Sequence, residues 1–339
     1  MGFPFYGQSF ALMENAGNSL GAPSYAGGEA GDETRARGFL SFYEAKEIKI
    51  PVPWGHVSAK LWGQENQRPV LALHGWQDNA GTWDPLAPMI SDKLPILAID
   101  FPGHGHSSWI PPGFQYYPWD LPRLILTIKD YFKWDKISIL GHSMGSIAGM
   151  RFACVFPDDV DFYISVDSLI YDDYDLNQVV ERFPKILRKI QLAQTRLTDE
   201  PPSYTMDEIK QKWHLGTNKS VALESVQHLA QRGLKASSAD PNKFYFNRDA
   251  RLKSILFNPE NKLLVGTLVK RLKCPTLYFK AIDSPYASDE YSVEMREVVE
   301  RNNAKFESHF VPGTHHVQLN NPERLAPTII NFLQKHNFI

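Results

Sequence analysis

Cysteine is nearly absent from this sequence of 339 residues, which contains only Cys154 and Cys274. Two cysteines cannot build a disulfide framework, so each is expected to pack as a small apolar residue in a reducing compartment. Long apolar runs are also missing, and no stretch approaches the roughly 20 residues that a membrane-spanning helix needs. The first residues lack the basic-then-apolar order of a secretory signal. These absences predict a cytoplasmic protein without a membrane span.

An excess of charge of either sign is missing as well. The formal net charge is -2, which gives no reason to expect a nucleic-acid partner or a basic face for membranes. Along the sequence no group of His and Asp residues has the spacing of metal ligands, so neither a metal nor another cofactor is expected. The sequence also contains no internal repeat. It says nothing about oligomeric state.

Aliphatic residues are scarce in residues 1–38, which contain 8 glycines. Such a segment buries little surface, and we expect a flexible N-terminal arm. The texture changes from about Ala45, where two alternating stretches resemble the strands of a hairpin.

Short, nearly continuous apolar runs follow, as expected of strands that are buried on both faces of a parallel sheet. They read PVLALHG, PILAID, KISILGH, DFYISVD, CPTLYFKA and KFESHFV. Helix-like segments lie between several of them. This alternation predicts an α/β fold, with a mainly parallel central sheet flanked by helices, over residues 39–168 and 269–339.

Residues 169–268 interrupt the alternation with little strand pattern. The stretch PKILRKIQLAQTRL predicts an amphipathic helix with Pro184 in its first turn, and its basic residues are expected to form a solvated face. Two further stretches, at about 205–215 and 219–233, also resemble helices, and Gly233 is expected to end the second. We therefore expect a helical insertion that forms a cap over the sheet.

Ser143 stands between Gly141 and Gly145, where a strand-like run gives way to a helix-like one. A sharp turn from strand to helix forces its corner residue into a strained conformation and requires small neighbours. This pattern predicts a nucleophile elbow that exposes the serine hydroxyl at the carboxyl edge of the sheet. The backbone amide of Met144, at the start of the helix, is then free to bind a developing oxyanion.

A serine nucleophile needs a base, and one of the pair His315 and His316 is the best candidate. The pair follows the last predicted strand and precedes the last predicted helix, which places it at the same sheet edge as Ser143. The other histidine of the pair is expected to be structural. Four further histidines lie in loops next to strands and are expected to brace those loops: His74, His104, His106 and His142.

Four motifs in this order resemble the α/β-hydrolase superfamily, and within it the animal serine hydrolase-like proteins. They are LALHGWQDNAGTWDPL, DFPGHGHSS, ILGHSMGS and GTHHVQLNNPE, and the resemblance covers about residues 45–335. Ser146 stands where the family usually has a further glycine. The resemblance implies the α/β-hydrolase fold with a helical cap.

The resemblance also implies site residues. The family's histidine usually lies seven residues before a proline, and counting back from Pro322 gives His315. The backbone amides of Trp76 and Met144 match its oxyanion hole. The acid usually follows the strand matched by CPTLYFKA, which favours Asp283, although Ala281 and a shortened loop depart from the pattern. Some relatives place the acid one strand earlier, which leaves Asp167 as the alternative.

These residues predict a serine hydrolase with a Ser-His-Asp triad that cleaves a small to medium carboxylic ester or thioester. The expected partner is a small-molecule acyl substrate. A carbon–carbon bond hydrolase with the same triad is an alternative, because relatives perform that chemistry. A non-catalytic ligand-binding protein on the same scaffold is another, since a fold does not fix a function.

Overall fold

The computed structural model describes residues 6–8, 10–12, 24–27, 39–41, 45–255 and 260–339. Most of the expected N-terminal arm, residues 1–38, lies outside these residues. Residues Met1–Lys46 form a unit of their own, and the described part of it contains four short strands that the sequence did not predict. β1 (Tyr6–Gln8) pairs antiparallel with β4 (Phe39–Ser41), and β2 (Phe10–Leu12) pairs antiparallel with β3 (Ser24–Gly27).

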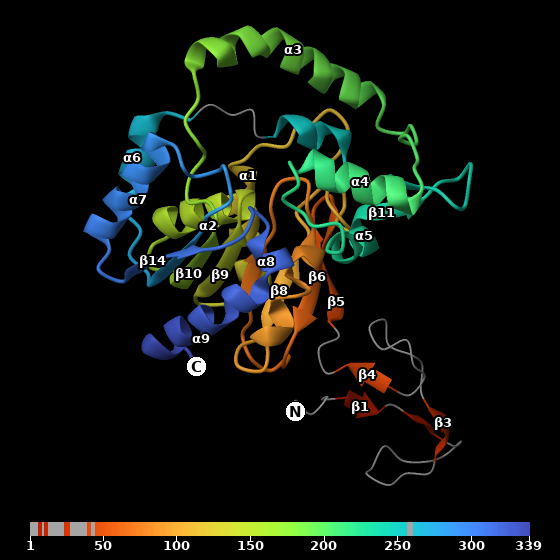
Figure 1. Ribbon diagram of the computed structural model, residues 1–339, viewed down its shortest axis with the longest axis horizontal. Coiled ribbons are helices and arrows are strands. Elements are labelled where there is room, and N and C mark those ends of the chain that lie inside the picture. Colours follow the sequence, from red (N-terminus) through yellow and green to blue (C-terminus); the bar gives the residue numbers. More distant parts are fainter. Residues whose placement is uncertain (1–5, 9, 13–23, 28–38, 42–44, 256–259) are drawn as a thin grey trace. The chain divides into compact units, whose positions relative to one another are not determined.

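The second unit, Glu47–Ile339, is built on an eight-stranded sheet with the order β14-β13-β10-β9-β7-β8-β6-β5 (Figure 1). The pairs from β14 to β8 are parallel, and β6 runs antiparallel to β8. The strands are β5 (Lys46–Val52), β6 (Gly55–Trp62), β7 (Val70–Leu73), β8 (Ile96–Ile99), β9 (Ile137–His142), β10 (Val160–Val166), β13 (Thr276–Ala281) and β14 (Phe306–Val311). Every residue of β7, β8 and β9 is buried, which confirms the prediction from the apolar runs.

Helices cover both faces of this sheet. Adjacent residues of a strand point to opposite faces, and β10 shows what each face contacts. The Tyr163 hydroxyl donates a hydrogen bond to the Ser146 carbonyl in α2 at 2.7 Å, whereas the Phe162 ring packs against Phe332 of α9. The helices outside the insertion are α1 (Asp120–Tyr131), α2 (Met144–Val155), α7 (Glu290–Asn302), α8 (Val317–Asn320) and α9 (Ala326–Lys335), with short 3-10 turns η1 (Ala80–Trp83), η2 (Ala87–Met89) and η4 (Pro322–Arg324).

The insertion between β10 and β13 is mainly helical, as predicted. It contains α3 (Leu176–Thr195), α4 (Met206–Gly216), α5 (Val226–Gly233), η3 (Ala250–Ser254) and α6 (Lys262–Val269), and an antiparallel pair, β11 (Leu234–Ala236) and β12 (Phe244–Phe246), that the sequence did not predict. The expected start of α3 at Pro184 is wrong. The helix begins eight residues earlier because the Asp175 side chain accepts a hydrogen bond from the Asn177 amide and caps it, so that Pro184 lies inside.

Buried polar contacts hold the insertion on the loops of the sheet. The Arg232 guanidinium of α5 forms an ion pair of 2.8 Å with Asp100, which follows β8. The Asn79 side chain donates to the Leu229 carbonyl at 2.9 Å. Figure 1 shows α3 and α4 beyond one end of the sheet strands. The insertion is therefore fixed to loops at the same edge as the predicted site.

Two expectations from the missing residue types are also tested. Cys154 and Cys274 are both free and buried, which confirms that they pack as apolar residues. Within the described ranges, no helix is long and apolar enough to cross a bilayer.

Candidate active site

Ser143 lies at the turn between β9 and α2 with φ 52° and ψ −120°, a strained conformation for a residue with a side chain. Its amide donates to the Val166 carbonyl at 3.1 Å, and its carbonyl accepts from the Ile147 amide at 3.0 Å. The turn is thus held on both sides by backbone hydrogen bonds. This geometry is the one that the sequence predicted for a nucleophile elbow.

The two flanking glycines give the turn its room. A Cβ on Gly141 would lie 2.6 Å from the backbone nitrogen of Ser146, and one on Gly145 would lie 2.3 Å from the Leu73 carbonyl oxygen. Ser146, the departure from the family pattern, is fully buried, and its hydroxyl donates to the Gly141 carbonyl at 2.6 Å. Its side chain therefore fastens the turn instead of crowding it.

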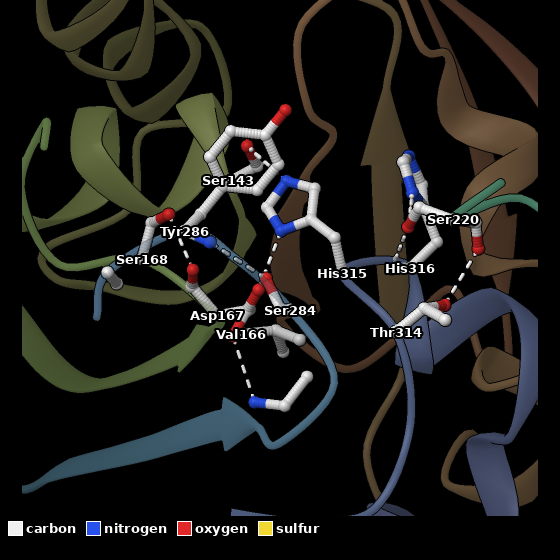
Figure 2. A network of polar contacts seen from close by, with 12 residues as sticks. Ser143, Val166, Asp167, Ser168, Ser220, Ser284, Tyr286, Thr314, His315 and His316 are labelled. Carbon is white, nitrogen blue, oxygen red and sulfur yellow. Dashed lines mark hydrogen bonds and ion pairs between the residues drawn. The ribbon is translucent and has the colours of Figure 1, made fainter. Parts of the chain in front are cut away.

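His315 connects the serine to a carboxylate. Its Nε2 lies 2.8 Å from the Ser143 Oγ, and its Nδ1 lies 2.7 Å from the Asp167 Oδ2 (Figure 2). The Tyr286 ring packs against the imidazole with a centroid separation of 4.5 Å. The structure thus brings together Ser143 and His315, as the sequence predicted, and adds Asp167, the alternative acid.

The Asp167 carboxylate is fully buried and accepts two more hydrogen bonds on its other oxygen. The Ala281 amide donates to Oδ1 at 2.9 Å, and the Lys280 ammonium lies 3.1 Å from the same atom. Lys280 is itself buried, which the sequence analysis missed. A lysine in an otherwise apolar strand, CPTLYFKA, was the available signal, because a buried cation needs a partner.

Asp283, the residue that the sequence favoured as the acid, makes different contacts. Asp283 is exposed, and its carboxylate accepts a hydrogen bond from the Gly313 amide at 3.1 Å. Its own amide donates to the Gly313 carbonyl at 3.0 Å, which fastens the loop after β13 to the loop after β14. Asp283 therefore holds the turn of the shortened loop. His315 instead contacts the carboxylate of Asp167, which follows the neighbouring strand β10.

His316, the other histidine of the pair, points away from the serine. Its Nδ1 lies 2.8 Å from the Ser220 Oγ, and its amide donates to the same oxygen at 3.0 Å. Ser220 belongs to the insertion, so His316 connects the histidine loop to it (Figure 2). His315 therefore lies at the serine, whereas His316 contacts the insertion, and the base role of His315 stays a prediction.

The four histidines expected to brace loops make such contacts, but His142 is the last residue of β9 and does not lie in a loop. The His74 Nε2 accepts from the Phe101 amide at 2.9 Å, and burial lowers the pKa of His74 to about 4, so it is neutral. The His104 Nε2 accepts from the Gln77 amide at 3.2 Å. The His142 Nε2 lies 2.8 Å from the His315 carbonyl oxygen. His106 donates its backbone amide to Asp100 at 2.8 Å. These contacts fix the loops around Ser143.

Trp76 and Met144, whose amides are the expected oxyanion hole, border the same pocket as Ser143 and His315. Met144 is the first residue of α2, where no intrahelical acceptor exists for its N–H. Within residues 45–255 and 260–339, neither N–H donates to a protein acceptor. The Trp76 indole instead donates to the Leu252 carbonyl at 2.8 Å, which turns that side chain toward the insertion.

The pocket has a volume of about 530 Å³. Residues of the sheet loops form one side of it, and residues of the insertion form the other. From the insertion come Ile170, Tyr171, Asp172, Tyr174, Val179, Lys212, Trp213, Gly216, Thr217, Phe246 and Arg248. Residues of the insertion and Ser143 therefore border one pocket.

Three buried side chains near Ser143 and His315 form a group that could hold a metal ion. Asp78, His142 and His316 each bring one donor atom within 4.8 Å of the others. The Asp78 Oδ2 and the His142 Nδ1 lie 3.9 Å apart, and in the described ranges neither has a hydrogen-bond partner. Such a donor set suits zinc and related metals, and a bridging water would satisfy the same atoms. Sequence spacing did not reveal this cluster, because its members come from three segments that lie far apart in the sequence.

Burial shifts the protonation of all three groups toward their neutral forms. It raises the pKa of Asp78 to about 7, against the hydrogen bonds from Asn79 and Thr82. It lowers the pKa values of His142 and His316 well below 6.5, and the positive charge of His315 would lower them further.

Comparison with known proteins identifies relatives that match most of the chain. A family model described as "alpha/beta hydrolase fold" matches residues 68–322. A "Probable serine hydrolase" of Drosophila melanogaster is 35% identical over 292 residues, which cover 86% of this chain and 88% of the relative. "Serine hydrolase-like protein 2" of Homo sapiens is 31% identical over 316 residues, covering 89% and 96%. The crystal structure of a hypothetical protein from Pseudomonas aeruginosa PAO1 has a TM-score of 0.72 and 29% identity, covering 87% and 100%.

Proposed function

Because the chain belongs to the α/β-hydrolase family, we propose that it is a serine hydrolase that cleaves a small to medium carboxylic ester or thioester through an acyl-enzyme. One observation carries the proposal: the His315 imidazole lies between the Ser143 Oγ, at 2.8 Å, and the Asp167 Oδ2, at 2.7 Å. A hydroxyl, an imidazole and a buried carboxylate in this order form the unit that performs acyl transfer on several unrelated folds.

In this mechanism Ser143 attacks the substrate carbonyl while the Nε2 of His315 takes the hydroxyl proton. The Asp167 carboxylate accepts the Nδ1–H hydrogen bond, which holds the imidazole in the tautomer whose Nε2 faces the serine, and it stabilises the imidazolium. The amides of Trp76 and Met144 bind the oxyanion. His315 then gives its proton to the leaving alcohol or thiol, and water releases the acid by the reverse sequence.

The insertion acts in this proposal as a cap that selects the acyl group. Its support is the pocket, in which insertion residues such as Trp213 and Phe246 face the loops that carry the triad. Apolar side chains around a few polar groups are typical of pockets for small molecules.

A fluorophosphonate probe and an activated ester test the proposal together. The wild type is expected to be labelled and to hydrolyse 4-nitrophenyl butyrate, and Ser143→Ala is expected to lose labelling and about 10³- to 10⁶-fold in turnover. Ser168→Ala is the matched control, because it removes another hydroxyl that borders the pocket. Circular dichroism checks that both variants are folded. An unlabelled wild type would favour a ligand-binding protein, and a labelled Ser143→Ala would place the nucleophile elsewhere.

A further inference from the structure

Arg248 is a cation in the wall of the pocket that contains Ser143. It follows β12 in the insertion, and its side chain is partly buried. Its Nη1 donates to the Gln77 carbonyl at 3.3 Å, and its guanidinium lies 4.7 Å from the centre of the Phe246 ring. Both contacts are with uncharged groups. Gln77 follows Trp76, so the guanidinium lies beside the expected oxyanion loop.

The charge of this guanidinium has no acidic partner among the residues that the structure describes. Within residues 45–255 and 260–339, no acidic side chain forms an ion pair with Arg248. Loss of hydration on burial lowers its pKa to about 10. The side chain is still protonated at neutral pH. Two other buried arginines of the insertion differ: Arg232 pairs with Asp100 at 2.8 Å, and Arg251 pairs with Asp249 at 2.6 Å.

The acids that border the pocket make other contacts. Asp172 accepts a hydrogen bond from the Ala287 amide at 2.7 Å, and burial raises its pKa. Asp78 faces His142 at 3.9 Å. A second cation, Lys212 of α4, borders the pocket from the insertion, with its ammonium 4.1 Å from the centre of the Tyr204 ring. Of the ionisable residues that border the pocket from the insertion, the cations Arg248 and Lys212 therefore outnumber the one acid of these, Asp172.

We infer that the substrate of this pocket is an ester or thioester that carries a carboxylate, and that Arg248 binds this carboxylate. Burial of a guanidinium costs free energy of hydration, and no charged partner in the described part of the chain offsets that cost for Arg248. A ligand carboxylate that pairs with the guanidinium would offset it. The planar guanidinium presents paired N–H donors that match a carboxylate, and hydrogen bonds between charged groups are the stronger ones. Lys212, at the exposed side of the wall, attracts the same charge.

This inference rests on the proposed function and narrows it, and matched pairs of esters test it. One pair is mono-4-nitrophenyl glutarate and its methyl ester, with the charge on the acyl side. The other pair is 4-acetoxybenzoate and its methyl ester, with the charge on the alcohol side. In one of the two pairs, Arg248→Gln is expected to lower kcat/KM for the ester that carries the carboxylate by about 10- to 100-fold. For the methyl ester of the same pair, kcat/KM is expected to change less than about 3-fold. Arg248→Lys is expected to recover part of the loss.

Lys235→Gln is the matched control, because it removes a positive charge from an exposed position of the insertion outside the pocket. The rate of fluorophosphonate labelling is a second measurement, and it does not depend on turnover. Glutarate is expected to slow labelling of the wild type but not of Arg248→Gln. Equal losses for charged and neutral esters would show a structural role and overturn the inference. So would an Arg248→Gln variant with unchanged rates and unchanged protection. Either result leaves the labelling of Ser143, and with it the proposed function, intact.

Discussion

Asp167 receives three hydrogen-bond donors on two carboxylate oxygens. His315 contacts one oxygen, and Lys280 and the Ala281 amide contact the other. The Lys280 ammonium also donates to the carbonyls of Ala281 and Ser284, at 2.6 and 3.1 Å, so its own position is fixed. The carboxylate is thereby held in one orientation, and its charge is balanced even when the imidazole is neutral.

Asp167→Asn is expected to lower turnover of an activated ester by about 10⁴-fold, because the amide no longer selects the productive tautomer of His315. Asp283→Asn is expected to change turnover little, since an amide oxygen can still accept the hydrogen bond from Gly313. The measurement is kcat for both variants side by side, with folding checked by circular dichroism. A larger loss in Asp283→Asn would move the acid to the loop after β13.

The sequence left this choice open for a physical reason. Asp167 follows β10 and Asp283 follows β13, and these strands are neighbours in the sheet. Strand patterns predict where a chain reaches the carboxyl edge, but not where a side chain points after it. Asp167 adopts φ 58°, a left-handed turn, and Asp283 pairs with Gly313. The pattern of apolar residues indicates neither feature. Ser143 was predictable because the glycines on either side of it indicate a sharp turn in the sequence itself.

Elements with a strong periodic pattern were predicted better than those held by contacts. The buried strands of the sheet are continuous apolar runs, so their sequence alone identifies them. In contrast, β11 and β12 are three residues each and gain their stability from pairing with each other. The start of α3 depends on the single capping side chain of Asp175, which outweighs the preference of Pro184 for a first turn. The periodicity of apolar residues therefore does not predict very short strands or the start of a helix that depends on one capping side chain.

Helix α4 of the insertion contributes Lys212, Trp213 and Gly216 to the pocket that contains Ser143. Its Trp213 is buried, borders the pocket and packs edge-to-face on Phe246 at 5.2 Å. Trp213→Leu is expected to enlarge the pocket and to raise kcat/KM for an octanoyl ester relative to an acetyl ester by about 10-fold or more. Leu215→Ala, on the exposed side of the same helix, is the control. A uniform change for all chain lengths would mean that α4 does not select the acyl group.

At the scale of the whole molecule, buried ionisable groups connect the site to stability. Asp78, His142 and His316 are all buried beside the triad and all favour their neutral forms. Their contributions to the pH dependence of unfolding have opposite signs. For the two histidines, stability is present above pH 6.5 and is lost as the pH falls through their lower folded-state values. These three groups therefore lower the free energy of unfolding least when none of them is charged.

The Asp78 contribution can be isolated by Asp78→Asn. Folding raises the pKa of Asp78 from 3.8 to about 7, so between these values the folded state binds more protons than the unfolded state. The free energy of unfolding contributed by Asp78 therefore falls as the pH rises from about 4 to 7, by roughly 2–4 kcal/mol. Asn has the same shape and cannot ionise, so it lacks this fall.

Thermal unfolding of the wild type and Asp78→Asn at pH 5 and pH 8 provides the measurement. The variant is expected to gain several degrees in Tm relative to the wild type between the two pH values, because only the wild type must bury a carboxylate at pH 8. The histidines are present in both proteins, so their contribution cancels in the comparison as long as Asp78 does not shift them. Parallel Tm profiles would show that the carboxylate of Asp78 is stabilised in the folded protein, as it would be by a cation held between Asp78, His142 and His316. Repeating the wild-type scan with a chelator then separates a bound metal, whose removal lowers Tm, from a carboxylate that is simply hydrated.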